Sequence, residues 1–170
     1  MLPQDQMIIV QQYVSICFIT ELYNNNFLES QFFNDMKFDN ESIKDCIKAI
    51  NIDSDGMFLI FLYSLLLIPK EKIYDVYKDE YDALDKKIDG LKIPLDSTYP
   101  ASHKKYIRHI RNAIAHGKVE FKEDSIFFND DYRGNQFCVE IPRCKIGDIL
   151  TDLQKILLNY VTDLKNGRSF

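Results

Sequence analysis

Apolar residues in the first third of the chain recur at helical spacing and are interrupted by turn-forming residues. Residues 4–24 carry apolar side chains three or four positions apart and end in the run NNN, which predicts a first helix. Two shorter helices are expected over residues 29–36 and 41–50, the second of them capped by Asp39 or Asn40. The N-terminal part of the chain is therefore predicted to be helical.

Three longer helical patterns follow, and they differ in how their charges are distributed. Residues 54–68 are apolar on every side, which is typical of a helix buried in the centre of a bundle. Residues 70–89 carry many charges and one apolar stripe, which predicts a helix that faces solvent. Residues 146–164 again place apolar side chains at helical spacing and predict a closing helix.

Between these last two patterns the period changes from that of a helix to that of a strand. A helix that opens within residues 97–102 is expected to run up to Gly117. After Gly117, the stretches VEFKEDSIFFND and NQFCVEI predict short strands joined by turns at residues 123–124 and 131–135. The expected fold is mainly α, a helical bundle with a small antiparallel β-ribbon inserted before the C-terminal helix. Residues 1–170 are expected to form a single domain.

Composition narrows the class of protein. The chain is 46% hydrophobic and 13% aromatic, which is too apolar for a disordered chain. Its first residues lack the basic region of a signal peptide, and its most apolar run, MFLIFLYSLLLI, is shorter than the roughly 20 residues that a bilayer-spanning helix needs. We therefore expect a cytoplasmic protein with no membrane partner.

The spacing of cysteines and histidines does not favour a metal site. No C-x-x-C pair occurs among the four cysteines, and the three histidines lie within one short segment without a nearby cysteine or acidic ligand. Because a ligand set needs more than two groups from one helix, we expect no metal and no cofactor.

Charge is distributed unevenly. The net charge of −5 argues against wholesale electrostatic capture of nucleic acid. Between Asp96 and Glu120, however, there is no acidic residue, and the segment carries five cations: Lys104, Lys105, Arg108, Arg111 and Lys118. Such a strip predicts local binding of an anion. Lys104 and Lys105 can equally be a solvated face.

The helix before Gly117 gathers polar groups on one side. At about 100° per residue, Arg108, Arg111 and Asn112 share a face, with His116 at its border and His109 near its margin. Cleavage of RNA without a metal needs a proton-transfer group and a cation beside the phosphate. His116 is expected to supply the first, as a general acid, and Arg111 the second through its planar fork of donors. Asn112 can orient phosphate or water, or bond to the helix itself.

The segment RNAIAH at residues 111–116, followed by glycine, resembles the motif of the HEPN superfamily, small helical bundles that bear Arg-x4–6-His. Arg111, Asn112 and His116 match the motif position by position. The motif helix, strand ribbon and closing helix look like bacterial HEPN domains with a β-hairpin after the motif. The resemblance implies an endoribonuclease that leaves a 2′,3′-cyclic phosphate and acts as a homodimer, often as a toxin or in defence against phage. Some relatives are inactive binding modules, and some are neutralised by a nucleotidyltransferase antitoxin.

Two further expectations follow for RNA cleavage. Arg108, Lys104, Lys105 and Lys118 are expected to bind RNA. One motif helix supplies a single clear proton-transfer group, whereas phosphate transfer needs both a base and an acid. We therefore expect twofold pairing of the motif helix, with small Ala113 and Ala115 permitting close approach. If one chain acts alone, His109 or His103 is the candidate for the second group.

Overall fold

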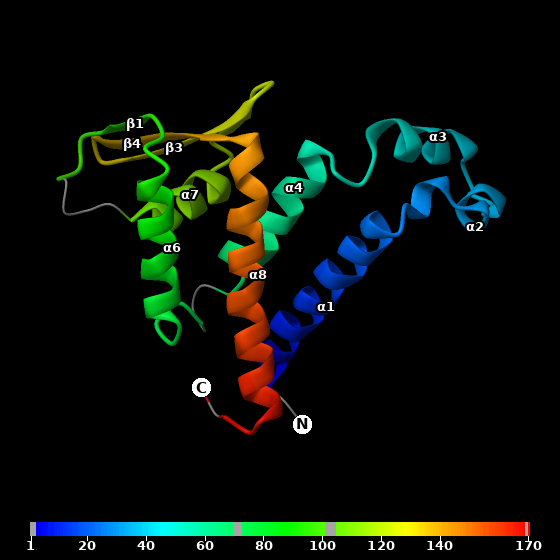
Figure 1. The fold of residues 1–170 in the computed structure, drawn as a ribbon, viewed down its shortest axis with the longest axis horizontal. Helices are drawn as coiled ribbons and strands as arrows, with labels where there is room; N and C mark the ends of the chain where they lie inside the picture. The colour runs from blue at the N-terminus through cyan, green and yellow to red at the C-terminus, as the bar shows by residue number, and fades with distance from the viewer. Residues whose placement is uncertain (1–2, 70–72, 101–104, 169) are drawn as a thin grey trace. The chain divides into compact units, whose positions relative to one another are not determined.

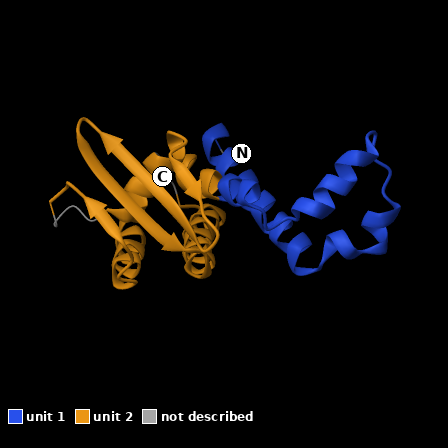
Figure 2. Ribbon diagram, turned by 90° about the horizontal axis from the view of Figure 1, so that it is seen from above, with its two compact units in different colours: residues 1–61 blue, residues 62–170 orange. Residues whose placement is uncertain are grey.

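The computed structural model describes residues 3–69, 73–100, 105–168 and 170. The chain forms two compact units, residues 1–61 and residues 62–170 (Figures 1 and 2).

The first unit is helical, as predicted. Its elements are α1 (Gln4–Asn24), η1 (Phe27–Glu29), α2 (Gln31–Asp35), α3 (Glu41–Ile50) and most of α4 (Asp55–Leu62). The expected bounds of α1 and α3 are confirmed. Short polar side chains begin two of these helices: Ser30 Oγ accepts from the Phe33 amide at 3.1 Å, and Asn40 Oδ1 accepts from the Ser42 amide at 3.1 Å. Of the two caps considered for α3, the structure therefore selects Asn40.

The apolar segment predicted to be a buried central helix is only partly buried. Helix α4 passes directly into a π-helical turn, η2 (Tyr63–Leu67). Leu62, Leu65 and Leu66 are buried, but Ile60 is 55% exposed and Tyr63 is 49% exposed. A π turn takes more residues than an α turn, so side chains after it are rotated away from the positions that α-helical spacing predicts.

The second unit contains three long helices and a sheet. The helices are α6 (Lys78–Gly90), α7 (Tyr106–Ala115) and α8 (Arg143–Lys165). The closing helix is confirmed, with its start three residues earlier than predicted. The solvent-facing helix begins at Lys78 rather than residue 70, and residues 70–72 lie outside the described residues.

Helix α7 also begins later than the sequence pattern predicted. Ser97 lies in a strand, so the opening expected within residues 97–102 is wrong at its first residue. Residues 101–104 lie outside the described residues, and regular helix begins at Tyr106.

A four-stranded antiparallel sheet forms the other layer of this unit. The strands are β1 (Leu95–Ser97), β2 (Val119–Phe121), β3 (Ser125–Tyr132) and β4 (Asn135–Pro142), in the order β1-β4-β3-β2. The predicted ribbon after Gly117 is confirmed as β2 to β4. Strand β1 is an addition that the sequence pattern did not predict. Its pairing partner, Val139 opposite Leu95, is far along the chain, and three residues are too few to show a strand period.

The β3–β4 turn is a two-residue connection. Tyr132 pairs with Asn135, and the residues between them, Arg133 and Gly134, have φ of 51° and 79°. Positive φ at both central positions is the signature of a type I′ hairpin, whose twist matches that of the two strands. This turn sets the register of β3 against β4.

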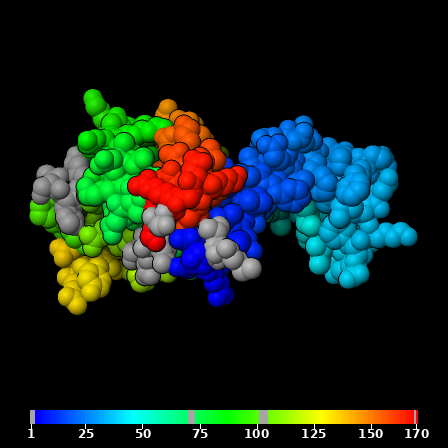
Figure 3. Space-filling view, turned by 90° about the horizontal axis from the view of Figure 1, so that it is seen from below, coloured from blue at the N-terminus to red at the C-terminus, as the bar shows by residue number. Residues whose placement is uncertain are grey.

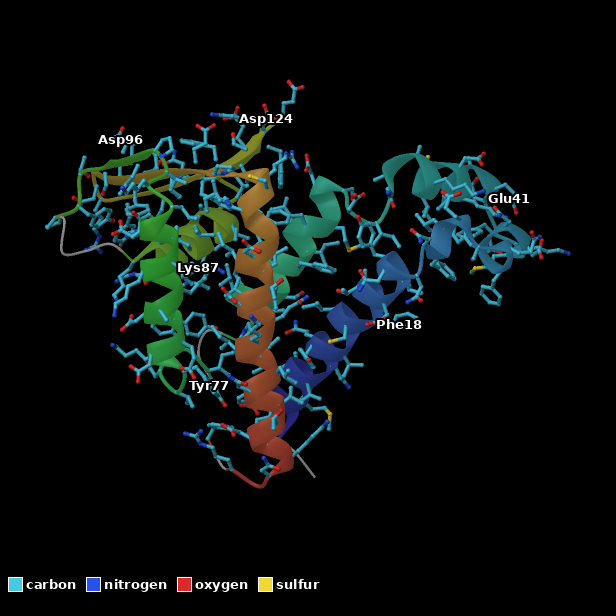
Figure 4. All side chains as sticks on the ribbon, viewed as in Figure 1. Phe18, Glu41, Tyr77, Lys87, Asp96 and Asp124 are labelled. Carbon is cyan, nitrogen blue, oxygen red and sulfur yellow. The ribbon has the colours of Figure 1, made fainter. Side chains whose placement is uncertain are left out.

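The core of the second unit lies on one face of the sheet, where α7 packs along β3 and where α6 and α8 extend away from the same side (Figure 1). Apolar residues at every second position of β3 and β4 are buried, namely Ile126, Phe128, Phe137, Val139 and Ile141, and Cys138 is buried as well. Two hydrogen bonds join the α6 region to α8, from Tyr77 to Asp163 at 2.7 Å and from Lys87 to Asp152 at 2.5 Å (Figure 4). The atoms of α6 and α8 accordingly form a continuous surface in Figure 3.

Among the described residues, no single helix has both the length and the hydropathy of a membrane-spanning segment, although Glu41–Ile50 and Asp55–Leu67 meet those criteria together across a sharp bend.

Candidate active site

Helix α7 divides into a buried side and an open side. The buried side carries Tyr106, Ile107, Ile110, Ala113 and Ile114. His103, named above as a candidate second proton-transfer group, lies outside the described residues. On the open side, Arg108 and Ala115 are exposed, while Arg111 and Asn112 are half-buried. The side chains named by the sequence motif therefore lie where α7 meets solvent.

The C-terminus of α7 is closed by a glycine turn that holds His116 at the surface. Gly117 has φ of 65°, and its amide donates to the carbonyl of Ile114 at 3.1 Å. The amide of Lys118 donates to the carbonyl of Ala113 at 2.8 Å. These two bonds form a Schellman motif, which requires the left-handed conformation that glycine adopts without strain. His116 is the exposed residue immediately before this turn.

The N-terminus of α7 is held by a carboxylate from α6. Asp85 Oδ1 accepts from the amide of Ile107 at 2.8 Å, and the side chain is buried. Burial raises the pKa of Asp85 to about 6, opposed by the Ile107 hydrogen bond. The first turn of α7 is thus tied to α6, and its last turn is closed by its own glycine turn.

A chain of hydrogen bonds links the open side of α7 to the sheet. Arg111 Nη2 donates to Asn112 Oδ1 at 3.1 Å, and Asn112 Nδ2 donates to Asp130 Oδ2 at 3.0 Å. The same oxygen of Asp130 lies 2.7 Å from His109 Nδ1. Arg111, Asn112, Asp130 and His109 thus form one network, which we call the α7–β3 network.

His109 lies inside the molecule, not on the face that carries Arg111 and His116. Its ring is 2% exposed and stacks on Phe137 with centroids 4.0 Å apart, while Tyr99 lies 4.9 Å away on a tilted plane. The helical angle placed His109 at the margin of the polar face, but Asp130 and Phe137 come from distant strands and enclose it. The geometry therefore gives no support to His109 as a second proton-transfer group.

Acidic residues from elsewhere in the chain neutralise part of the predicted cationic strip. Lys105 is paired with Asp82 at 2.5 Å, and Lys118 is paired with Asp131. Hydrogen bonds from Lys105 and Lys78 lower the pKa of Asp82 to about 2. Lys104 lies outside the described residues. The segment between Asp96 and Glu120 contains no acidic residue. In the fold, however, acidic side chains from other segments lie beside Lys105 and Lys118.

Among the described residues, Arg108 and Arg111 remain as the cations of the open side. Arg108 makes no ion pair with any residue that the structure describes. Burial, and then the positive charge of Arg108, lower the pKa of Arg111. Like charges held together in this way favour an anion that lies between them.

Neither Asp130 nor Asp85 was predicted from the sequence as part of the site, although the strand pattern indicated that Asp130 is buried. Ile126, Phe128 and Asp130 are two residues apart on β3, so the strand period alone places the Asp130 carboxylate on the core side. An acidic residue at a core position is uncommon unless it is paired. Asp85 carried no comparable signal, since it lies in a helix rich in charge.

No group of three or more His, Cys, Asp or Glu side chains that could hold a metal ion occurs in the described parts of the chain.

Comparison with known proteins places these residues in a family. The family model described as HEPN pEK499 p136 matches residues 3–164. The match runs through both compact units and includes the whole of α7 and the sheet. No curated protein and no solved structure matches the chain.

Proposed function

Because this chain belongs to the HEPN pEK499 p136 family, we propose that it is a metal-independent endoribonuclease whose active site lies on the open side of α7. The observation that carries the proposal is the placement of Arg111 and His116, a cation and a proton-transfer group, on the solvent-facing side of one rigidly held helix. The motif residues could have been buried like His109, and they are not.

The reaction follows from the chemistry of RNA. The 2′-hydroxyl attacks the adjacent phosphorus and loses its proton, a bond forms between phosphorus and the 2′-oxygen, and the bond to the 5′-oxygen breaks. The products are a 2′,3′-cyclic phosphate and a 5′-hydroxyl. Arg111 stabilises the charge that develops on the phosphoryl oxygens, and His116 donates the proton to the departing 5′-oxygen. Arg108, exposed on the same side, holds a neighbouring phosphate.

A base is also needed, and among the described residues no second histidine lies on the open side of α7. A second copy of the chain, related by a twofold axis at α7, supplies its own His116. Ala115 is exposed and permits close approach of two such helices. Ala113, which was expected to do the same, is fully buried and takes no part.

The biological role that suits this activity is that of a cytoplasmic toxin or an anti-phage effector, restrained by an antitoxin protein such as a nucleotidyltransferase. Ion pairing of Lys105 and Lys118 leaves few cations for general RNA binding. This favours a substrate that is recognised locally.

The test is cleavage of total RNA by the purified protein, compared directly with a His116→Ala variant. We expect cleavage by the unmodified protein to persist in EDTA, to be blocked by a 2′-deoxy substitution at the scissile nucleotide and to be lost in the variant. Activity that disappears with chelator and returns with magnesium would contradict the acid–base mechanism. If the unmodified protein cuts no RNA, the alternative is a non-catalytic HEPN module that binds a nucleotide, RNA or a protein partner through the same side of α7.

A further inference from the structure

Asp130 is a buried acid that the proposed reaction does not use directly. It lies on the core side of β3 and is 4% exposed. A single oxygen, Oδ2, receives both His109 Nδ1 at 2.7 Å and Asn112 Nδ2 at 3.0 Å. A buried carboxylate is costly unless it is paired in this way, so its presence beside the motif helix needs an explanation.

The acid determines which way the amide of Asn112 points. Asn112 turns its NH₂ group toward Asp130, where Oδ2 accepts from Nδ2 at 3.0 Å. Its carbonyl oxygen then points the other way, toward Arg111, and accepts from Nη2 at 3.1 Å. If the amide were reversed, two oxygens would face each other at Asp130 and two donors would face each other at Arg111.

His109 fixes the acid in turn. Its Nδ1 is held against Oδ2 of Asp130, and its ring is stacked on Phe137. Packing of the ring therefore limits movement of the carboxylate, and the constraint passes from the core through Asp130 and Asn112 to Arg111.

We propose that Asp130 is a positioning residue of the active site, which orients the Asn112 amide and through it holds the guanidinium of Arg111 in place for the phosphate. This inference rests on the proposed ribonuclease function. Asp130 does not touch the substrate, and Asn112 serves mainly as the link between the acid and the arginine. Because misplacement of a catalytic group by about 1 Å can cost about a hundredfold in rate, such a link affects turnover more than binding.

The experiment combines Asp130→Ala, which removes the acceptor of the Asn112 hydrogen bond, with Asn112→Ala and the double variant. Asp96→Ala is the matched control, because Asp96 is exposed on β1 (Figure 4) and loses the same carboxylate away from α7. We expect Asp130→Ala to lower kcat for RNA cleavage at least about tenfold, with KM within about twofold and the control unchanged. The double variant should be no slower than Asn112→Ala, since both substitutions break one link.

Several outcomes would overturn the inference. An unchanged kcat in folded Asp130→Ala would do so, and so would losses in the double variant that multiply, because Asp130 would then act independently of Asn112. A loss that disappears when assays are run well below each variant's Tm would indicate only a structural role.

A second measurement does not need activity or a folded Asp130 variant. The guanidinium NMR signals of Arg111, assigned by their loss in Arg111→Lys, should show hindered rotation in the unmodified protein and free rotation in Asn112→Ala. Free rotation in both proteins would refute the link. If the unmodified protein cuts no RNA but its Arg111 is hindered, the proposed function fails while the orienting network stands.

Discussion

At the scale of single residues, Arg111 and His116 both belong to the sequence motif, but their structural surroundings differ. His116 is exposed at the end of α7, whereas Arg111 is half-buried and donates to Asn112. A substitution at either position removes a proposed catalytic group, but only the substitution of Arg111 also removes packing and a hydrogen bond. Activity and stability therefore respond differently at the two positions.

We predict that His116→Ala and Arg111→Ala both abolish cleavage and that only the second lowers stability clearly. The free energy of unfolding should change by less than about 0.5 kcal/mol for His116→Ala, which is typical of a surface substitution. For Arg111→Ala it should fall by about 1 kcal/mol, because the aliphatic stem loses contacts and Asn112 loses a donor. Urea denaturation of both variants measures the difference. Equal stabilities would contradict the half-buried position of Arg111.

At the scale of elements, α7 is the part of the fold that the site depends on. Asp85 of α6 holds its first turn, the Schellman turn closes its last, and the α7–β3 network joins its middle to the sheet. Two of these attachments can be tested separately, one through its pH dependence and one through its backbone conformation.

The Asp85 attachment should make stability depend on pH. Burial raises the pKa of this carboxyl from 3.8 to about 6, so the unfolded chain releases the proton more readily than the folded one. Its contribution to stability is fully present below about pH 4 and is lost as pH rises through about 6. Asp85→Asn keeps an oxygen acceptor without the charge. The Tm of this variant relative to the unmodified protein should therefore be higher at pH 7.5 than at pH 4.5.

Asp79→Asn, an exposed aspartate on α6, is the control for the loss of one negative charge. If both variants change in parallel with pH, the effect is one of net charge and not of the buried cap.

The glycine turn after α7 should be sensitive to an added methyl group. Gly117 has φ of 65°, so Gly117→Ala places an L side chain in the left-handed region, at a cost of about 1 kcal/mol. Gly147→Ala is the matched control, since Gly147 lies within α8 with open space around it. There the same change should stabilise by about 0.5–1 kcal/mol. Thermal melting of the two variants should move in opposite directions, and cleavage should fall only for Gly117→Ala because His116 precedes the turn.

At the scale of the whole molecule, the site is expected to be complete only in a dimer. Among its described residues, one chain presents one candidate proton-transfer group on the open side of α7, and the two arginines there repel a second copy unless apolar contacts or RNA hold the pair together. The family match covers residues 3–164 and therefore includes both compact units. The oligomeric state should therefore be measured on the chain with both units present.

We predict a particle of about 40 kDa by sedimentation at micromolar concentration, twice the chain mass of 20.0 kDa. If two copies share each cleft, excess His116→Ala protein should also lower the turnover of each wild-type chain by forming mixed dimers. A monomer with full cleavage activity, unaffected by the variant, would exclude the shared cleft.

Local patterns in the sequence were enough to predict much of this protein. Helices α1, α3 and α8 and the β2–β4 ribbon follow from the spacing of apolar residues, which reports the period of the backbone. The open face of α7 follows from the same rule, because residues three or four positions apart share one side of a helix. The candidate residues Arg111, Asn112 and His116 could therefore be named without a structure.

Tertiary structure decided what these residues meet. Strand β1 exists only through its pairing with β4, and His109 is buried only because Phe137 and Asp130 return to α7 from the sheet. Lys105 and Lys118 likewise form ion pairs with Asp82 and Asp131, which neutralise their charge locally. Except for Lys118 and Asp131, the two partners in each of these contacts lie more than about twenty positions apart in the sequence. The three- to four-residue spacing of a helix and the two-residue spacing of a strand do not reach that far. Such contacts depend on how the elements pack together, and no local period of the sequence encodes that arrangement.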